Sequence, residues 1–329
     1  MRSLLASVLA SAVAVLALAT FAGSPGAQTT PEVLEACAPA EREIDARALP
    51  RTVDPGRCPV EGRRVEDGLV GGAVPPAGKG FHAEVLTKEG AQELEVRRLV
   101  DGTIELDHVG KETPDTAGAR ALDRATQSPG ECSDGAFESG AWRVEGAFVY
   151  RIDWRTTPGY LSRRAAISAI RQAGGNVANT LNRCRLGDQV PAGIAYKGYT
   201  ARQALAGGGS CPPGDGVNAV SFGDLPRALA VACTRYRLEE GYGVVTSSDV
   251  KIDDTGTLWT TNPNARSCKS RYDLEGVMTH ERGHTFGLHH VPEDAHPNLT
   301  MGPVINGACQ SSERSLGRGD VLGLGGKYR

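Results

Sequence analysis

The sequence predicts an α+β fold, because strand-like and helix-like hydrophobic patterns occur along the same chain. Residues 81–86, 94–100 and 103–108 form short alternating runs of the kind found in hairpins. A longer apolar run at 147–154 predicts a further strand, and residues 162–182 then repeat apolar positions at three and four, as a helix does. The 329 residues are enough for two domains.

The first long helix is expected to start at Ser162, whose hydroxyl suits the N-cap position. Its apolar stripe predicts packing against a sheet and comprises Ile167, Ile170, Gly174, Val177 and Leu181.

Three more strands are expected at residues 218–222, 227–233 and 242–252. A second helix is expected to begin after Asp273 as N-cap, and residues 315–324 form the last helical segment.

The amino terminus has the pattern of a secretory signal peptide over residues 1–27. Arg2 is followed by an apolar run from Leu4 to Phe21 and by small residues that suit cleavage. No other stretch approaches the length of a membrane span. The net charge of −3 gives no sign of a nucleic acid or an anionic membrane as partner. We therefore expect a secreted protein, with no membrane association once the signal is removed.

All eight cysteines lie beyond the signal segment, and an even number in an exported chain indicates disulfides. Eight cysteines allow 105 pairings. Chain order and the expected domain limits favour Cys37–Cys58, Cys132–Cys184, Cys211–Cys233 and Cys268–Cys309.

Five of the seven histidines lie between His280 and His296, and the run from His280 to His290 contains H-E-x-x-H-x-x-G-x-x-H. Residues i and i+4 of a helix lie on one face, so His280 and His284 can bind one metal ion. Glu281 lies beside them, where it can deprotonate a metal-bound water. Gly287 can end the helix and bring His290 back as third ligand.

Other assignments of the third ligand remain open from the residues alone. His289 is adjacent to His290, although the spacing from Gly287 favours His290. A downstream carboxylate, Glu293 or Glu313, is a further alternative. His289 and His296 are expected at a cleft rim or on the surface.

This motif resembles that of the metzincin zinc metalloproteases, and within them the matrixins. Met301 follows the third histidine by eleven residues, and Met301-Gly302-Pro303 is similar to the methionine turn that supports the zinc site in that family. The signal-bearing chain and the block at 279–288 resemble secreted bacterial members.

The resemblance implies a matrixin-like catalytic domain at 132–329, with a mixed twisted sheet, a zinc helix and a C-terminal helix. Residues 28–109 would then be an N-terminal pro- or accessory region, β-rich in its second half, and 110–131 a linker rich in turn residues.

The chain departs from animal matrixins in two respects. It has no histidine between His108 and His280, so their second, structural zinc site cannot be built in the same way, and one catalytic Zn²⁺ is expected. Ca²⁺ is common in the family, but no loop here is specific enough to locate it. Matrixin pro-regions block the zinc with a cysteine, whereas Cys58 shares only an Arg-Cys pair with that segment and is expected in a disulfide.

The expected function is that of a monomeric, secreted zinc endopeptidase acting on protein or peptide substrates, with Glu281 as general base. An extended substrate would pair with an edge strand, expected near residues 242–252. Two alternatives remain open: a non-proteolytic binding protein on the same scaffold, and a zinc amidase acting on cell-wall peptides.

Overall fold

The computed structural model describes residue 37 and residues 42–107, 128–204 and 209–329. The predicted signal peptide at 1–27 and most of the predicted linker at 110–131 lie outside the described residues. The fold is α+β, as predicted, with a large mixed sheet and three α-helices in the part of the chain that is described.

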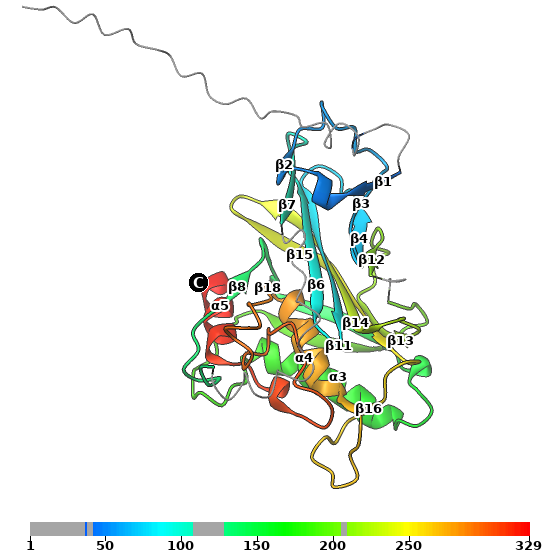
Figure 1. Ribbon diagram of the computed structural model, residues 1–329, viewed down its shortest axis with the longest axis vertical. Coiled ribbons are helices and arrows are strands. Elements are labelled where there is room, and N and C mark those ends of the chain that lie inside the picture. The colour runs from blue at the N-terminus through cyan, green and yellow to red at the C-terminus, as the bar shows by residue number, and fades with distance from the viewer. Residues whose placement is uncertain (1–36, 38–41, 108–127, 205–208) are drawn as a thin grey trace, which may run out of the picture.

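A ten-stranded sheet runs through the molecule in the order β11-β10-β13-β15-β14-β5-β6-β7-β2, with β9 paired to β15 (Figure 1). Strands β11, β10, β13 and β15 are parallel, and every pair from β15–β14 through to β7–β2 is antiparallel. The strands are β2 (Thr52–Val53), β5 (Lys79–Thr87), β6 (Ala91–Arg98), β7 (Ile104–Asp107), β9 (Trp142–Arg143), β10 (Ala147–Asp153), β11 (Gly193–Tyr199), β13 (Ala219–Gly223), β14 (Ala228–Glu239) and β15 (Tyr242–Asp253).

A smaller four-stranded sheet, in the order β1-β3-β4-β12, lies at the amino-terminal end of the molecule (Figure 1). Two further pairs of short strands join loops near the helices. The remaining elements are β1 (Glu43–Asp45), β3 (Arg64–Asp67), β4 (Val70–Ala73), β8 (Glu138–Ser139), β12 (Ser210–Cys211), β16 (Trp259–Thr260), β17 (Tyr272–Asp273), β18 (Leu288–His289), and the 3₁₀ turns η1 (Ala46–Ala48), η2 (Trp154–Thr156) and η3 (Ser312–Arg314).

The α-helices are α3 (Arg163–Ala178), α4 (Leu274–Thr285) and α5 (Arg318–Tyr328). Both predicted N-caps are confirmed: the Ser162 side chain accepts the N–H of Ala165, and Asp273 accepts that of Gly276. The predicted apolar stripe of α3 is wrong at its last position, because the helix ends before Leu181 and that side chain is exposed.

The amino-terminal strands continue the same sheet as the strands that follow residue 132. Strand β5 pairs with β14 along nearly its whole length, from Lys79 opposite Arg237 to Thr87 opposite Ala228. The expectation that residues 242–252 form a sheet edge is therefore wrong, because β15 lies between β13 and β14.

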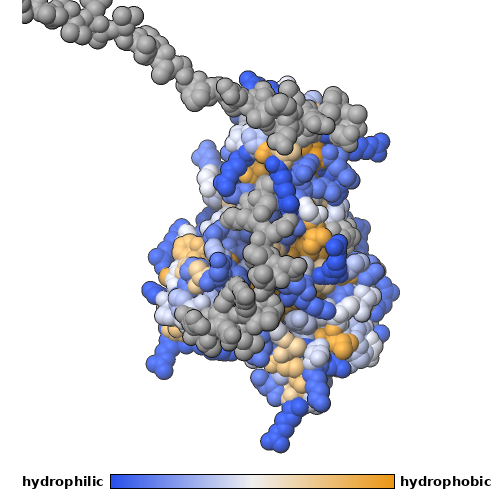
Figure 2. Space-filling model, in the orientation of Figure 1, coloured by the Kyte–Doolittle hydropathy of each residue, from blue (hydrophilic) through white to orange (hydrophobic). Residues whose placement is uncertain are grey.

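Two hydrophobic cores are divided by the sheet. One lies beneath α3, α4 and α5 and includes Ile170, Trp259 and Met301. The other lies between the amino-terminal strands and includes Phe81 and Leu94, together with Val231 of β14. The surface seen in Figure 2 is mainly hydrophilic, with scattered apolar patches.

All four predicted disulfides are confirmed: Cys37–Cys58, Cys132–Cys184, Cys211–Cys233 and Cys268–Cys309. The last ties the segment before α4 to the loop after Met301. No helix among the described residues is both long and apolar enough to cross a membrane.

Candidate metal centre

Helix α4 carries His280, Glu281 and His284, and all three side chains are fully buried. The helix is positioned by its contact with α3, where the Asn176 amide donates to Glu275 and Thr279. A hydrogen-bonded chain of hydroxyls, Thr234 to Ser248 to Thr285, joins it to β14 and β15. Helix α4 is thus held by both the sheet and the neighbouring helix.

Gly287 ends the helix in a backbone conformation that favours glycine, with φ of +100°. A Cβ atom at this position would lie 2.2 Å from the carbonyl oxygen of Trp142, so the site also lacks room for a side chain. The Trp142 indole N–H donates to the His284 carbonyl at 2.9 Å, and the same carbonyl accepts the Gly287 N–H at the helix end. The chain then turns and returns His290 to the two helical histidines.

The Nε2 atoms of His280, His284 and His290 face one another in a small triangle. The separations are 3.0 Å for His280–His290 and 3.2 Å for the two pairs that include His284. Ligands at roughly 2.0–2.1 Å from a tetrahedral zinc ion would lie about 3.3–3.4 Å apart. The triangle is therefore close to the size that one metal ion requires.

In two of the three rings, the opposite ring nitrogen fixes which nitrogen carries the proton. The Nδ1–H of His280 donates to the Thr300 carbonyl at 2.8 Å, and that of His284 donates to the Leu288 carbonyl at 2.9 Å. Their Nε2 atoms therefore present lone pairs to the centre of the triangle. Burial lowers the pKa of all three rings, to about 4 for His280, which keeps them neutral and able to bind a metal.

Residues 300–303, which follow the histidines in the chain, pack against helix α4 and support the candidate metal site. Met301 is buried and lies against Gly283, where a Cβ atom would be only 2.3 Å from the methionine sulfur. Asp320 of α5 holds this turn by accepting the backbone N–H groups of Thr300 and Met301. Pro303 is buried just beyond it. The Thr300 carbonyl, which accepts the His280 proton, is thereby fixed in place.

A fourth potential ligand, which sequence reasoning missed, comes from the amino-terminal strand β5. Glu84 is fully buried, and it groups with His280, His284 and His290 so that one donor atom of each lies within 4.8 Å of all the others. Its Oε1 is 3.9 Å from the His290 Nε2.

Glu84 also lies beside Glu281, the residue expected to act as base. None of the four carboxylate oxygens accepts a hydrogen bond from a side-chain donor among the described residues, and the two carboxyl groups instead interact with each other. Burial raises the pKa of Glu84 well above its usual value, and the Glu281 charge raises it further. Burial also raises the pKa of Glu281, to about 7. Two adjacent buried carboxyl groups beside three neutral imidazoles form an environment that suits a divalent cation.

His289 is not at a cleft rim or on the surface, and that expectation is wrong. It is 1 % exposed, with Nδ1 at 3.0 Å from Glu93 and Nε2 at 3.0 Å from Glu95, both on β6. Burial opposes a charge on the ring, but the two carboxylates outweigh it and raise the pKa of His289 to about 10. Both nitrogens are thus engaged as donors, so His289 is unsuited to binding the metal.

The remaining alternatives for the third ligand also lie away from the triangle. Glu313 accepts the Asn306 N–H, and neither it nor Glu293 belongs to the groups of described residues that could hold a metal ion. His296 is partly buried and pairs with Asp134 at 2.9 Å. The structure thus brings together His280, Glu281, His284 and His290.

The signal for the missed residues lay in the strand pattern. His82 and Glu84 alternate with apolar residues on β5, as Glu93 and Glu95 do on β6, and all four are buried. Their apolar neighbours face the second core, so these polar side chains face the metal centre. The regular spacing of charged residues in both strands of the hairpin was a sequence signal that this face contacts a polar partner.

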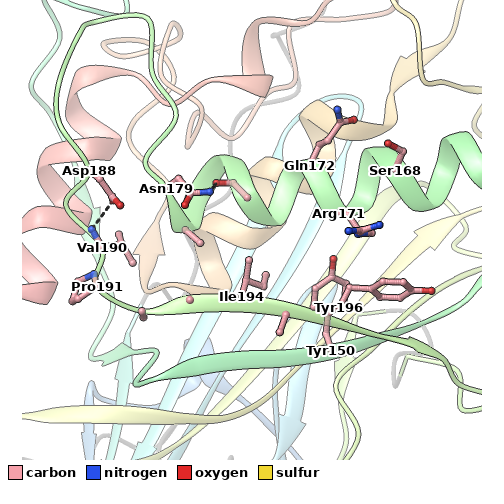
Figure 3. Close-up of a pocket in the computed structure, with 15 residues that line it drawn as sticks. Tyr150, Ser168, Arg171, Gln172, Asn179, Asp188, Val190, Pro191, Ile194 and Tyr196 are labelled. Carbon is pink, nitrogen blue, oxygen red and sulfur yellow. Dashed lines mark hydrogen bonds between the residues drawn. The ribbon is translucent and has the colours of Figure 1, made fainter.

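A hollow of about 800 Å³ lies elsewhere, between α3 and β11 (Figure 3). It is lined by Arg171, Asn179, Asp188 and Tyr196, and Asp188 accepts the Val190 N–H at its edge. No histidine contributes to it. The candidate metal site itself is enclosed, since His290 is the most exposed of its residues, at 9 %.

Comparison with known proteins gives no family assignment: no protein-family model and no curated protein matches the chain. The geometry of the centre is therefore the basis for assigning a function.

Proposed function

We propose that this chain is a secreted zinc-dependent endopeptidase of the metzincin, matrixin-like class. The observation that carries the proposal is the Nε2 triangle of His280, His284 and His290, with Glu281 on the adjacent helical position. Gly287 and Met301 support it, because one turns the chain toward His290 and the other fills the space under α4. The four disulfides fit an exported, oxidising environment.

The imidazoles of His280, His284 and His290 would hold a zinc ion, which when bound would supply Lewis-acid chemistry for a water and for the scissile carbonyl. Glu281 accepts the proton of the attacking water and passes it to the departing amine nitrogen. The backbone carbonyls of Thr300 and Leu288 keep two of the imidazoles oriented and protonated on the far nitrogen. Substrates are unfolded or extended segments of protein.

The test is hydrolysis of a denatured protein by the chain, both intact and after limited proteolysis. Activity should disappear with a chelator and return with Zn²⁺. Glu281→Gln should lower the rate at least about 100-fold while one metal ion per chain remains bound. Glu240→Gln, at an exposed turn, is the matched control and should change neither property. Zinc-dependent cleavage that survives Glu281→Gln would refute this mechanism.

Assays on the same protein preparations distinguish two other functions from the proposed endopeptidase. The metal chemistry would also serve an amidase acting on cell-wall peptides, and release of soluble fragments from insoluble cell wall distinguishes that substrate. The enclosure of the centre favours a non-hydrolytic binding protein. One tightly bound zinc without hydrolysis in any form of the chain would establish that alternative.

A further inference from the structure

The edge of the sheet nearest the metal centre is occupied by a strand of the chain itself. On one side β14 pairs with β15, and on the other it pairs antiparallel with β5. Without β5, β14 would be an edge strand beside α4. A free edge next to the metal centre is where an extended peptide would add as a strand, so β5 lies in the place that a substrate needs.

Strand β5 also directs a carboxylate at the metal ligands. Glu84 stands opposite Ala232 of β14, and its side chain enters the space between the three imidazoles and Glu281. Its Oε1 lies 3.9 Å from the His290 Nε2, which is about half an ångström longer than the tetrahedral ligand spacing. The Glu84 carboxylate therefore lies in the position beside the three imidazoles that a reacting water would need.

We propose that Glu84 is the fourth ligand of the metal and that residues 43–107 are a built-in inhibitor of the centre. This inference rests on the proposed function, whose substrate would need the position that β5 fills. The inhibitor blocks the centre twice, since its strand covers the β14 edge and its carboxylate replaces the water.

The fit between the inhibitor and the centre is specific. Glu93 of β6 lies 3.4 Å from the His290 Nδ1 and 3.0 Å from the His289 Nδ1. His82 of β5 stacks on Trp142, with ring centroids 4.9 Å apart, and packs against His284 at 5.0 Å. Glu93 and Glu95 of the hairpin thus contact His289 and His290 in the other part of the chain, and these specific contacts favour docking in this one register.

The disulfides permit this inhibitor to be removed. Cys37–Cys58 lies within the amino-terminal part, and the other three bonds lie between Cys132 and Cys309. A single cut between Asp107 and Ser128 would therefore leave no covalent bond between the inhibitor and the metal centre. Because Cys58 is paired, it has no free thiol with which to block the metal, and Glu84 takes that role.

The first experiment tests the ligand in the uncut, full-length chain. Glu84→Gln should change the visible spectrum of the Co²⁺-substituted protein and weaken Zn²⁺ binding, measured by chelator competition, about 10-fold or more. Glu89→Gln, at the exposed tip of the same hairpin, is the matched control and should change neither. Should the Gln variant fail to fold, Glu84→Asp withdraws the carboxylate by one methylene and should give a smaller change in the same direction. An unaltered spectrum and affinity in the Gln or, failing that, the Asp variant would overturn the assignment of Glu84.

The second experiment tests inhibition, with a specific protease site inserted between Asp107 and Ser128. The uncut chain should be inactive on peptides, and cutting followed by dilution should separate the two pieces without reductant and release activity. Equal activity before and after cutting, or pieces that never separate at nanomolar concentration, would overturn the inhibitor. If separated pieces bind zinc yet hydrolyse nothing, the proposed function fails, while the spectrum still decides the role of Glu84.

Discussion

His289 and His290 are adjacent in sequence, yet they have opposite electrostatic surroundings. Burial lowers the pKa of His290 well below its usual value, whereas Glu93 and Glu95 raise that of His289 to about 10. The sequence spacing from Gly287 favoured His290 as the ligand, and of the two histidines only His290 belongs to the described groups that could hold a metal ion. The burial and charge of His289 could not be foreseen, because its partners come from β6, far away in the chain.

The raised pKa of His289 makes stability depend on pH. The folded protein holds this proton more tightly than the unfolded chain, so the stabilisation is complete below about pH 6.5 and is lost as the pH rises toward 10. For metal-free protein, we expect His289→Gln to lower the urea midpoint strongly at pH 6 and little at pH 10. A difference between wild type and variant that stays constant over this range would contradict the ion pair.

Gly287 offers a second test at a single residue. Gly287→Ala would place a methyl group against the Trp142 carbonyl in a conformation that disfavours L-residues. We expect a loss of about 2–4 kcal/mol in the free energy of unfolding. Gly241→Ala is the matched control, because this turn glycine also has a positive φ, but its added Cβ would meet open space. Equal losses in the two variants, measured by urea unfolding, would show that the contact with Trp142 is unimportant.

At the scale of elements, the sequence predicted what is encoded locally. The strand patterns, the N-caps Ser162 and Asp273 and the helix-ending Gly287 depend on neighbours a few residues away, and these predictions are confirmed. The pairing of β5 with β14 depends on residues far apart, and no local pattern specifies it. For that reason the edge of the sheet was misplaced and Glu84 was missed.

Helix α5 contributes to the metal centre through Asp320, which accepts the N–H groups of Gly317, Thr300 and Met301. Replacing it with alanine leaves three buried donors without this acceptor. We expect Asp320→Ala to cost about 2–4 kcal/mol in unfolding free energy and to weaken zinc binding, because the Thr300 carbonyl would no longer hold His280. Asp294→Ala, on an exposed turn, serves as control. If the zinc affinity of the Asp320 variant were unchanged, α5 would not contribute to metal binding.

At the scale of the whole molecule, the disulfides follow chain order, which is why a simple rule could pair them correctly. Cys132–Cys184 closes a loop of 52 residues and joins the start of the second part to the segment after α3. By chain entropy, replacing both cysteines with serine should lower the unfolding free energy by up to about 4 kcal/mol. A thermal midpoint unchanged by the double replacement would contradict this contribution.

The placement of the disulfides also affects the equilibrium between the closed and open forms of the protein. While the chain is intact, the β5–β6 hairpin is present at the metal centre at a high effective concentration, which does not change when the protein is diluted. After one cut the same contacts become a bimolecular equilibrium between two molecules, and their occupancy then falls with dilution. Dilution into a large volume would therefore drive a cut protein toward its open form, while an uncut protein would stay closed at any dilution.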